Sequence, residues 1–280
     1  MNLIADSGST KTDWLIQTTT ASPTLITSSG INPCLMNDKQ IVDILCSEVL
    51  PHITQHPSRI FFYCAGCRPD QQGRMATLLT TILSAHETHV NSDLMGAAHA
   101  LCGNSPGIVA ILGTGSGSAV YDGSRFTTTI PSLGYILGDE GSGAVLGRRL
   151  LGDIFKNQLS AHLTAAFRDA YPTLTLSSTI EQVYRGNTPN RYLAQFSHFL
   201  SAHRHEEEIR RMLINEFRTF FSRNIRPYDR TDLSVNFVGS IATVFEEELR
   251  AAADTEGYKI GDVLRSPIER LASFCSLHSV

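Results

Sequence analysis

Two short turns rich in glycine and hydroxyl residues follow apolar runs of the sequence. The first covers 6–11 and the second 113–117, with the residues Asp6, Ser7, Gly8, Ser9, Thr10, Lys11 and Gly113, Thr114, Gly115, Ser116, Gly117. Glycine lets backbone N–H groups approach anionic oxygens, the hydroxyls add donors, and Lys11 adds a positive charge. A single such turn is typical of a plain hairpin, but the pair, with Asp6 and Lys11 in the first, predicts phosphate binding.

The second turn does not fit the common nucleotide-binding loops. Its spacing is G-x-G-x-G, and the residues after it, 119–121, are typical of a strand that ends in the hairpin signal Asp122-Gly123, whereas a dinucleotide-binding unit needs a helix there. The sequence also contains no G-x-x-x-x-G-K-[ST] loop. A Rossmann unit and a Walker loop are therefore excluded.

Asp93 follows the strand-like residues 89–91 and precedes the good helix formers 94–101. One interpretation is a helix N-cap, a position that aspartate favours. The other is a general base, because a helix N-terminus favours the carboxylate form that accepts a proton from an alcohol.

Two further segments allow more than one interpretation. Gly138–Gly143 holds Asp139 and Glu140 between glycines, as a simple loop and cap or as a site for sugar hydroxyls or water-bound Mg²⁺. Cys64-Ala65-Gly66-Cys67 has redox spacing, but no second pair completes a zinc site, and we favour small buried side chains at a strand end.

Composition limits the class of protein. The 280 residues allow one large domain or two ordinary ones, and a net charge of −4 argues against nucleic acid as a partner. Residues 94–121 carry no charged side chain, but their glycines and Pro106 argue against a membrane span. Without a secretory leader pattern or a dense cysteine framework, a cytoplasmic protein is expected.

Apolar patterning supplies the elements that hold these residues. Short strands are expected at 3–5, 14–16, 59–63, 89–91, 108–112, 119–121 and 235–238, and helices at 40–50, 71–86, 94–102, 144–156, 159–170, 178–185, 190–202, 206–225, 241–256 and 267–276. The strand–turn–strand pattern at the start recurs at 109–117, which suggests two related α/β halves facing each other across a cleft, unless the likeness is chance.

Taken in order, several of these segments resemble a known family over nearly the whole chain. They are Asp6–Thr10, Asp93–Ala98, Ile111–Ser116, Gly134–Gly143 and Gly239-Ser240. They are similar to the BadF/BadG/BcrA/BcrD-type ATPases of the actin, sugar kinase and Hsp70 superfamily, and most to its N-acetylglucosamine kinase branch. The resemblance implies an α/β fold of two ribonuclease-H-like domains with a central cleft. The first would span 1–106, completed by a C-terminal helix in 262–280, and the second 107–261.

The resemblance also implies roles for single residues. Asp93 would be the catalytic base for the 6-hydroxyl, and Asp6 would hold Mg²⁺ through water, with Asp139 as a second candidate. The sugar would contact Asn32, Asp93, Ser116, Gly117, Gly134 and Asp139. ATP would contact Ser7, Gly8, Ser9, Thr10, Lys11, Gly113, Thr114, Gly115, Gln195, Gly239 and Ser240.

The chain departs from its relatives at a few of these places. Gly117 replaces a common asparagine, Leu133 a tryptophan of the mammalian kinase, and Cys64 and Arg270 a frequent glycine. The first three changes, at Gly117, Leu133 and Cys64, put the identity of the sugar in question more than the chemistry. We therefore expect an ATP- and Mg²⁺-dependent amino-sugar 6-kinase with small-molecule partners. The alternatives are an ATPase that activates a radical dehydratase and a non-catalytic sugar-binding regulator, and whether the protein is a homodimer is left open.

Overall fold

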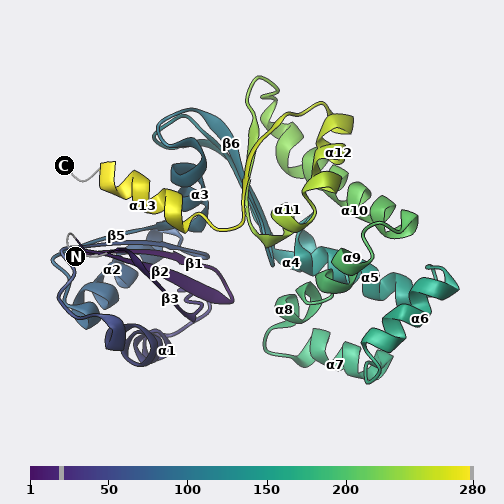
Figure 1. Ribbon diagram of the computed structural model, residues 1–280, viewed down its shortest axis with the longest axis horizontal. Helices are drawn as coiled ribbons and strands as arrows, with labels where there is room; N and C mark the ends of the chain where they lie inside the picture. Colours follow the sequence, from purple (N-terminus) through teal and green to yellow (C-terminus); the bar gives the residue numbers. More distant parts are fainter. Residues whose placement is uncertain (19–21, 278–280) are drawn as a thin grey trace. The chain divides into compact units, whose positions relative to one another are not determined.

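The computed structural model describes residues 1–18 and 22–277 (Figure 1). The chain forms two compact units. The first combines Met1–Ser105 with Ser266–Val280, and the second is Pro106–Arg265. Each unit contains one mixed five-stranded sheet with helices packed on it. This is the two-domain actin-like α/β fold that the resemblance implied.

The sheet of the first unit has the order β3-β2-β1-β4-β5. Its strands are β1 (Asn2–Ser7), β2 (Lys11–Gln17), β3 (Thr24–Ser29), β4 (Arg59–Cys64) and β5 (Glu87–Ser92). The first three strands pair antiparallel, while β1, β4 and β5 run parallel. In the parallel part Ser7, Cys64 and Ser92 stand in register at the strand ends. The segments that follow these three strands therefore begin at one edge of the sheet.

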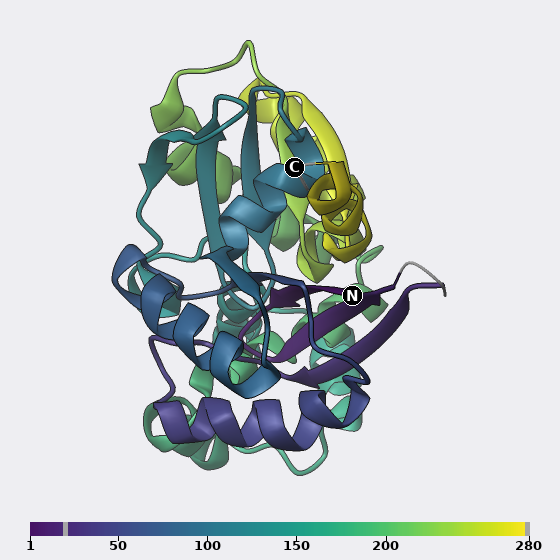
Figure 2. The same ribbon diagram turned by 90° about the vertical axis from the view of Figure 1, so that its left-hand side faces the viewer.

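Helices cover both faces of this sheet (Figures 1 and 2). One face packs on α1 (Asp38–Ile44), which continues as a π turn over Leu45–Val49, and on α2 (Pro69–Leu83), around Trp14 and Phe62. The other packs on α3 (Asp93–Cys102) and α13 (Ile268–Leu277), around Ile4 and Leu271. The alternation of Leu3, Ile4 and Ala5 between the faces follows from the two-residue period of a strand.

The second sheet, read from β8 to β10, has the order β8-β7-β6-β9-β10. Its strands are β6 (Gly107–Leu112), β7 (Ser116–Tyr121), β8 (Phe126–Ile130), β9 (Val235–Val238) and β10 (Ile260–Leu264). As in the first unit, two antiparallel pairs are followed by two parallel ones. The two units thus share one strand plan, as the recurring strand–turn–strand pattern suggested.

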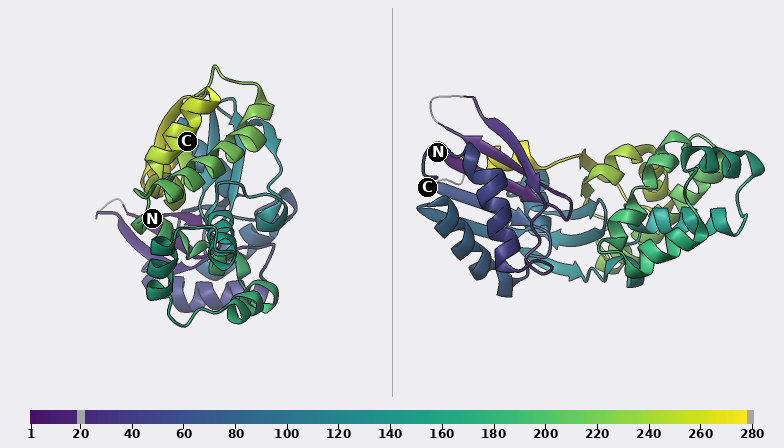
Figure 3. Two further views of the ribbon diagram at one scale, coloured as in Figure 1. Left: turned by 90° about the vertical axis from the view of Figure 1, so that its right-hand side faces the viewer. Right: turned by 90° about the horizontal axis from the view of Figure 1, so that it is seen from below.

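The helices of the second unit follow one another in sequence and appear in teal, green and yellow-green in Figure 3. They are α4 (Gly134–Leu137), α5 (Gly143–Phe155), α6 (Ala161–Ala170), α7 (Leu176–Arg185), α8 (Pro189–Ala194), α9 (Ser197–Ala202), α10 (Glu207–Phe220) with a π turn over Phe221–Ile225, α11 (Ser240–Val244) and α12 (Glu246–Glu256). A large apolar cluster with several buried phenylalanines joins them to β6 and β9.

Two helices that the sequence predicted as continuous are broken. The stretch 190–202 divides at Gln195-Phe196, and the stretch 241–256 divides at Phe245. Both breaks carry a fully buried phenylalanine, Phe196 and Phe245. Burying the ring outweighs the loss of helical continuity, because local propensity is a weak preference beside tertiary packing.

The uncharged stretch 94–121 is most of α3 followed by β6 and β7, as the interpretation of a helix end and a buried strand expected. In the described part of the chain, no helix has both the length and the apolar character needed to span a bilayer.

Candidate functional site

The first glycine turn joins β1 to β2. Gly8 N–H donates to the carbonyl of Lys11 at 3.0 Å, and buried Ser7 Oγ accepts from Ile31 N–H at 3.0 Å. Gly30 lies directly on this turn, because a Cβ at that position would be 2.4 Å from the Gly8 carbonyl oxygen. Close packing fixes the base of the turn, while Gly8 and Thr10 remain exposed.

Lys11 at the end of the turn is paired with an aspartate that sequence reasoning missed. Lys11 Nζ lies 2.7 Å from Asp13 Oδ2, and Thr27 Oγ1 donates to Asp13 Oδ1 at 3.1 Å. The Asp13 side chain is buried and the Lys11 side chain is 61% exposed, so the cation remains accessible at the turn. A lysine and an aspartate two residues apart in a strand share one face, which is the signal that could have found the pair.

Asp93 is the first residue of α3, and Ser92 is the N-cap. Ser92 Oγ accepts from Met95 N–H at 3.2 Å, while Asp93 Oδ1 accepts from Leu94 N–H at 2.8 Å. The N-cap interpretation of Asp93 is therefore wrong, because the preceding serine takes that role. The Asp93 carboxylate is free of the capping contact that would have occupied it.

Two carboxyl groups at this edge of the first sheet have raised pKa values. Burial raises the pKa of Asp6 to about 7, and the charges of Asp93 and Asp13 add to this while Lys11 opposes it. Burial raises the pKa of Asp93 to about 6, against the backbone N–H groups of Leu94 and Asp93 that lower it. The effect of the Asp93 and Asp13 charges on Asp6 shows that both of these carboxylates lie near Asp6.

These residues fit a hydrated divalent cation. Among the described residues, no hydrogen bond to the Asp6 carboxylate is found, and no three His, Cys, Asp or Glu side chains converge as direct metal ligands. Mg²⁺ prefers oxygen ligands and keeps several waters. A group of negatively charged carboxylates suits such an ion, because Asp6 has no hydrogen-bond partner among the described residues. The charge of the ion would also reduce the repulsion between the carboxylates.

Asn32 is held beside the turn that follows β4. Its Oδ1 accepts from Cys34 N–H at 3.0 Å, and the same oxygen would lie 2.2 Å from a Cβ at Gly66. Asn32 also follows Ile31, which hydrogen-bonds to Ser7 in both directions. The first unit therefore gathers the first turn, Asn32 and Asp93 at one edge of its sheet.

The second glycine turn joins β6 to β7 and is fixed by the start of α5. Gly113 N–H donates to the Gly115 carbonyl at 3.0 Å, and Gly143 N–H and Ala144 N–H donate to the carbonyls of Gly113 and Thr114 at 2.8 and 3.1 Å. The strand after the turn confirms the hairpin interpretation and the rejection of a Rossmann unit.

Gly239 places the start of α11 against this second turn. Its φ is +131°, and a Cβ there would be 2.2 Å from the Leu112 carbonyl oxygen, so only glycine fits. Ser240 is the first residue of α11. Gln195 is exposed at the end of α8, one residue after Ala194, whose Cβ would lie 3.2 Å from a Cβ at Gly143. These expected adenosine contacts thus surround the start of α5.

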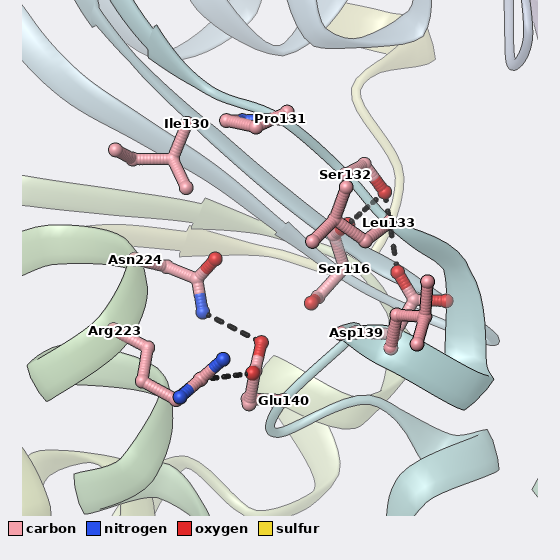
Figure 4. Close-up of a pocket in the computed structure, with 11 residues that line it drawn as sticks. Ser116, Ile130, Pro131, Ser132, Leu133, Asp139, Glu140, Arg223 and Asn224 are labelled. Carbon is pink, nitrogen blue, oxygen red and sulfur yellow. Dashed lines mark hydrogen bonds and ion pairs between the residues drawn. The ribbon is translucent and has the colours of Figure 1, made fainter.

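A pocket opens beside the second turn (Figure 4). On one side lie Ser116 and Asp139, and Ser132 Oγ donates to the Ser116 carbonyl at 3.0 Å and to Asp139 Oδ1 at 3.2 Å. Burial raises the pKa of Asp139, while the Ser116 N–H and the Ser132 hydroxyl oppose the rise. Gly117 and Gly134 adjoin this lining without being part of it.

The opposite side of the pocket carries Glu140, which the sequence suggested, and two partners of it that the sequence did not suggest. Glu140 forms an ion pair with Arg223 and accepts from Asn224 Nδ2 at 3.1 Å (Figure 4). Burial raises the pKa of Glu140, but these hydrogen bonds outweigh it and the pKa is lowered. Arg223 and Asn224 lie in the π turn after α10, far along the chain, and no sequence signal pairs them with Glu140. Apolar residues complete the wall: Ile130, Pro131, Leu133 and Leu137.

Comparison with known proteins gives a strong match among solved structures. No protein-family model and no curated protein matches the chain. A Porphyromonas gingivalis protein provisionally named an N-acetylglucosamine kinase is 42% identical, with all of both chains covered and a TM-score of 0.96.

Two other solved structures share the fold at low sequence identity. A Chromobacterium violaceum protein with the same provisional name is 15% identical, with a TM-score of 0.75 over 98% of both chains. A Listeria monocytogenes protein provisionally named an N-acetylmannosamine kinase is 11% identical, with a TM-score of 0.52 over 100% of this chain and 99% of its own.

Proposed function

Because the chain belongs to the N-acetylglucosamine kinase-like branch of the actin-type sugar kinases, we propose that it transfers the γ-phosphoryl group of ATP to a sugar. The acceptor is the 6-hydroxyl of an amino sugar, with N-acetylglucosamine as the first candidate. The observation that carries this proposal is the 42% identity over the full chain with the Porphyromonas gingivalis protein. The carboxylate of Asp93 at the carboxyl end of the first sheet supports it from the chemistry of the site.

The two glycine turns bind the phosphates in this proposal. In the first unit, Ser7, Gly8, Ser9 and Thr10 offer backbone and hydroxyl donors, and Lys11 offers a charge that Asp13 holds at the turn. In the second unit, Gly113, Thr114 and Gly115 offer the corresponding backbone. Gly239, Ser240 and Gln195 contact the adenosine. Positioning and charge neutralisation of this kind are the main work of a protein in phosphoryl transfer.

Asp6 holds Mg²⁺ through water, with Asp139 as a second candidate, and the bound ion neutralises phosphate charge. The sugar contacts Asn32 and Asp93 of the first unit and Ser116, Gly117, Gly134 and Asp139 of the second. The polar and apolar sides of the pocket around Asp139 suit a sugar, which presents hydroxyl edges and C–H faces. The departures at Gly117 and Leu133 bear on which sugar is accepted.

Asp93 orients the acceptor hydroxyl and takes its proton. A pKa of about 6 leaves this carboxylate ionised at neutral pH and close enough to the working pH to exchange a proton efficiently. Because Ser92 caps the helix, the Asp93 carboxylate is not needed for that purpose. The hydrogen bond from Leu94 N–H helps to fix its orientation.

The test is an assay of ADP release with ATP and Mg²⁺ and a panel of sugars. N-acetylglucosamine, glucosamine, N-acetylmannosamine and glucose are compared with a sugar-free control, and NMR of the product locates the phosphate. We expect sugar-dependent release and a phosphate on C6 of an amino sugar. ADP release at the same rate with and without sugar would support the ATPase alternative. Sugar binding without turnover would support the regulator, and either result contradicts the proposal.

A further inference from the structure

The turn after β4 brings two cysteines together. Cys67 N–H donates to the Cys64 carbonyl at 3.3 Å, and Gly66 has a φ of +71°. This is a β-turn with glycine at its third position, and such a turn keeps its end Cα atoms within about 7 Å. A disulfide spans Cα atoms about 4.4–6.8 Å apart, so the backbone allows a bond between these two residues.

The two thiols are chemically unequal. Cys64 is fully buried and Cys67 is 5% exposed, so a small reagent reaches Cys67 first. The Cys64 thiol donates a hydrogen bond to the Cys67 sulfur, which lowers the pKa of Cys67 against the opposing effects of burial and of Asp93. The same hydrogen bond, followed by burial, raises the pKa of Cys64. Cys67 is therefore suited to react as the thiolate and Cys64 to follow it.

We propose that Cys64 and Cys67 form a reversible dithiol–disulfide pair that reacts with small hydroperoxides. The Cys67 thiolate attacks one peroxide oxygen, the O–O bond breaks, and Cys67 becomes a sulfenic acid while the peroxide leaves as water or an alcohol. Cys64 then attacks the Cys67 sulfur, the S–S bond forms, and the sulfenic oxygen leaves as water with the Cys64 proton. Two thiols lose two electrons and one peroxide gains them. A small dithiol reductant reverses the change by thiol exchange.

The pair lies next to Asn32. A Cβ on Gly66, between the two cysteines, would lie 2.2 Å from Asn32 Oδ1, and Cys34 Sγ donates to the Gly66 carbonyl at 2.9 Å. A disulfide between Cys64 and Cys67 shifts the Gly66 backbone, and because Gly66 packs against Asn32, it also shifts the Asn32 side chain. This consequence rests on the proposed function: oxidation weakens sugar binding at Asn32 and leaves Asp93 in place.

The first experiment needs no assay of turnover. The reduced full-length protein is treated with hydrogen peroxide, and mass spectrometry with peptide mapping identifies the product. We expect a loss of two hydrogens, a Cys64–Cys67 link, and recovery with dithiothreitol. Cys64→Ser and Cys67→Ser abolish the link, and Cys46→Ser, an exposed cysteine in the same unit, keeps it. Oxygen addition without a link, or a link to Cys34, overturns the proposal.

A second measurement tests the consequence at the sugar site. The KM for the sugar, compared before and after oxidation, is expected to rise roughly five-fold, the ratio for one lost hydrogen bond. The kcat is expected to stay close to that of the reduced protein. A KM unchanged by a mapped disulfide overturns the link to Asn32. Absence of sugar turnover in the reduced protein overturns the proposed function instead, and the mapped disulfide remains an independent result.

Discussion

Asp6 and Asp93 are buried enough to raise their pKa values, and the charge of Asp93 adds to the rise at Asp6. A protein selected only for stability would replace one of them, since a buried charge is costly unless it is paired. Asp13 has such a partner in Lys11, whereas Asp6 and Asp93 have no lysine or arginine within ion-pair distance in the described residues. This arrangement is expected of groups kept for binding a cation and a proton.

Replacing Asp93 tests its role as the base. Asp93→Asn keeps the shape and the bond from Leu94 N–H but cannot accept a proton, so turnover should fall by roughly 10²- to 10⁴-fold. Nucleotide affinity, measured by calorimetry, should be nearly unchanged. Asp70→Asn, an exposed aspartate in the first turn of α2, is the matched control and should retain full turnover. Near-normal turnover in Asp93→Asn would refute the assignment.

The raised pKa of Asp6 has a measurable effect on stability. Its folded pKa of about 7 exceeds the ordinary 3.8, so the folded protein binds more protons than the unfolded chain between these values. The free energy of unfolding therefore falls as pH rises through this window. Asp6→Asn removes that dependence and should raise the Tm at pH 8 more than at pH 5, in buffer free of divalent cations. Equal changes in Tm at the two pH values would show that the charge of Asp6 does not destabilise the folded protein.

At the scale of elements, the sequence predicted best where apolar runs are buried. The strands around both glycine turns were found because residues such as Ile4 and Val109 are fully buried. β3 was missed because it is a largely exposed edge strand of mostly polar composition. β10 was missed because Gly261 and Asp262 interrupt its pattern. Gly261 is there to avoid the Asn236 side chain, whose Oδ1 would be 2.2 Å from a Cβ.

The candidate site was predictable to the extent that its residues are adjacent in sequence. The two turns, Asp93 and Asp139 could be proposed as site residues because glycine spacing and strand ends are local signals. The partners that only folding brings close were not found. Asp13, which the strand period places on the same face as Lys11, was overlooked, but Arg223 reaches Glu140 from another helix. Such pairings depend on strand register and helix packing, which residue types alone do not encode.

Helix α5 offers a paired test of how its glycines act. A Cβ at Gly147 would be 1.8 Å from the Leu193 carbonyl oxygen in α8, whereas a Cβ at Gly152 meets nothing within 4 Å. Gly147→Ala should therefore cost about 1–3 kcal/mol as the two helices separate. Gly152→Ala should stabilise by about 0.5–1 kcal/mol, because alanine favours the helix. Urea unfolding measures both, and equal effects would contradict the close contact of α5 with α8.

For the molecule as a whole, the shared strand order places a glycine turn at the corresponding position of each unit. In each, a hairpin turn lies at the end of a central strand whose other neighbour runs parallel. Ligands of such sheets bind beyond the carboxyl ends of the parallel strands, which is where both glycine turns are found. The repeated sequence pattern therefore reflects a repeated architecture and is not a chance likeness of two turns.

The C-terminal helix α13 is part of the first unit's core. Leu271 is fully buried with Ile4 and Leu15, whereas Leu277 in the same helix is 78% exposed. Leu271→Ala should lower the free energy of unfolding by about 2–5 kcal/mol. Leu277→Ala should change it by no more than about 0.5 kcal/mol. Thermal and urea unfolding compare the two, and an equal effect would mean that α13 does not support the first sheet.

The same helix sets an order of events on the ribosome. Strands β1 to β5 emerge early, but the face of their sheet that holds Ile4 and Leu15 is covered only in part, by α3, until residues 268–277 have been made. The second unit, Pro106–Arg265, is continuous in sequence and emerges complete before them. Chaperones should therefore bind nascent chains that are stalled before residue 268, because the first sheet of these chains still exposes apolar side chains.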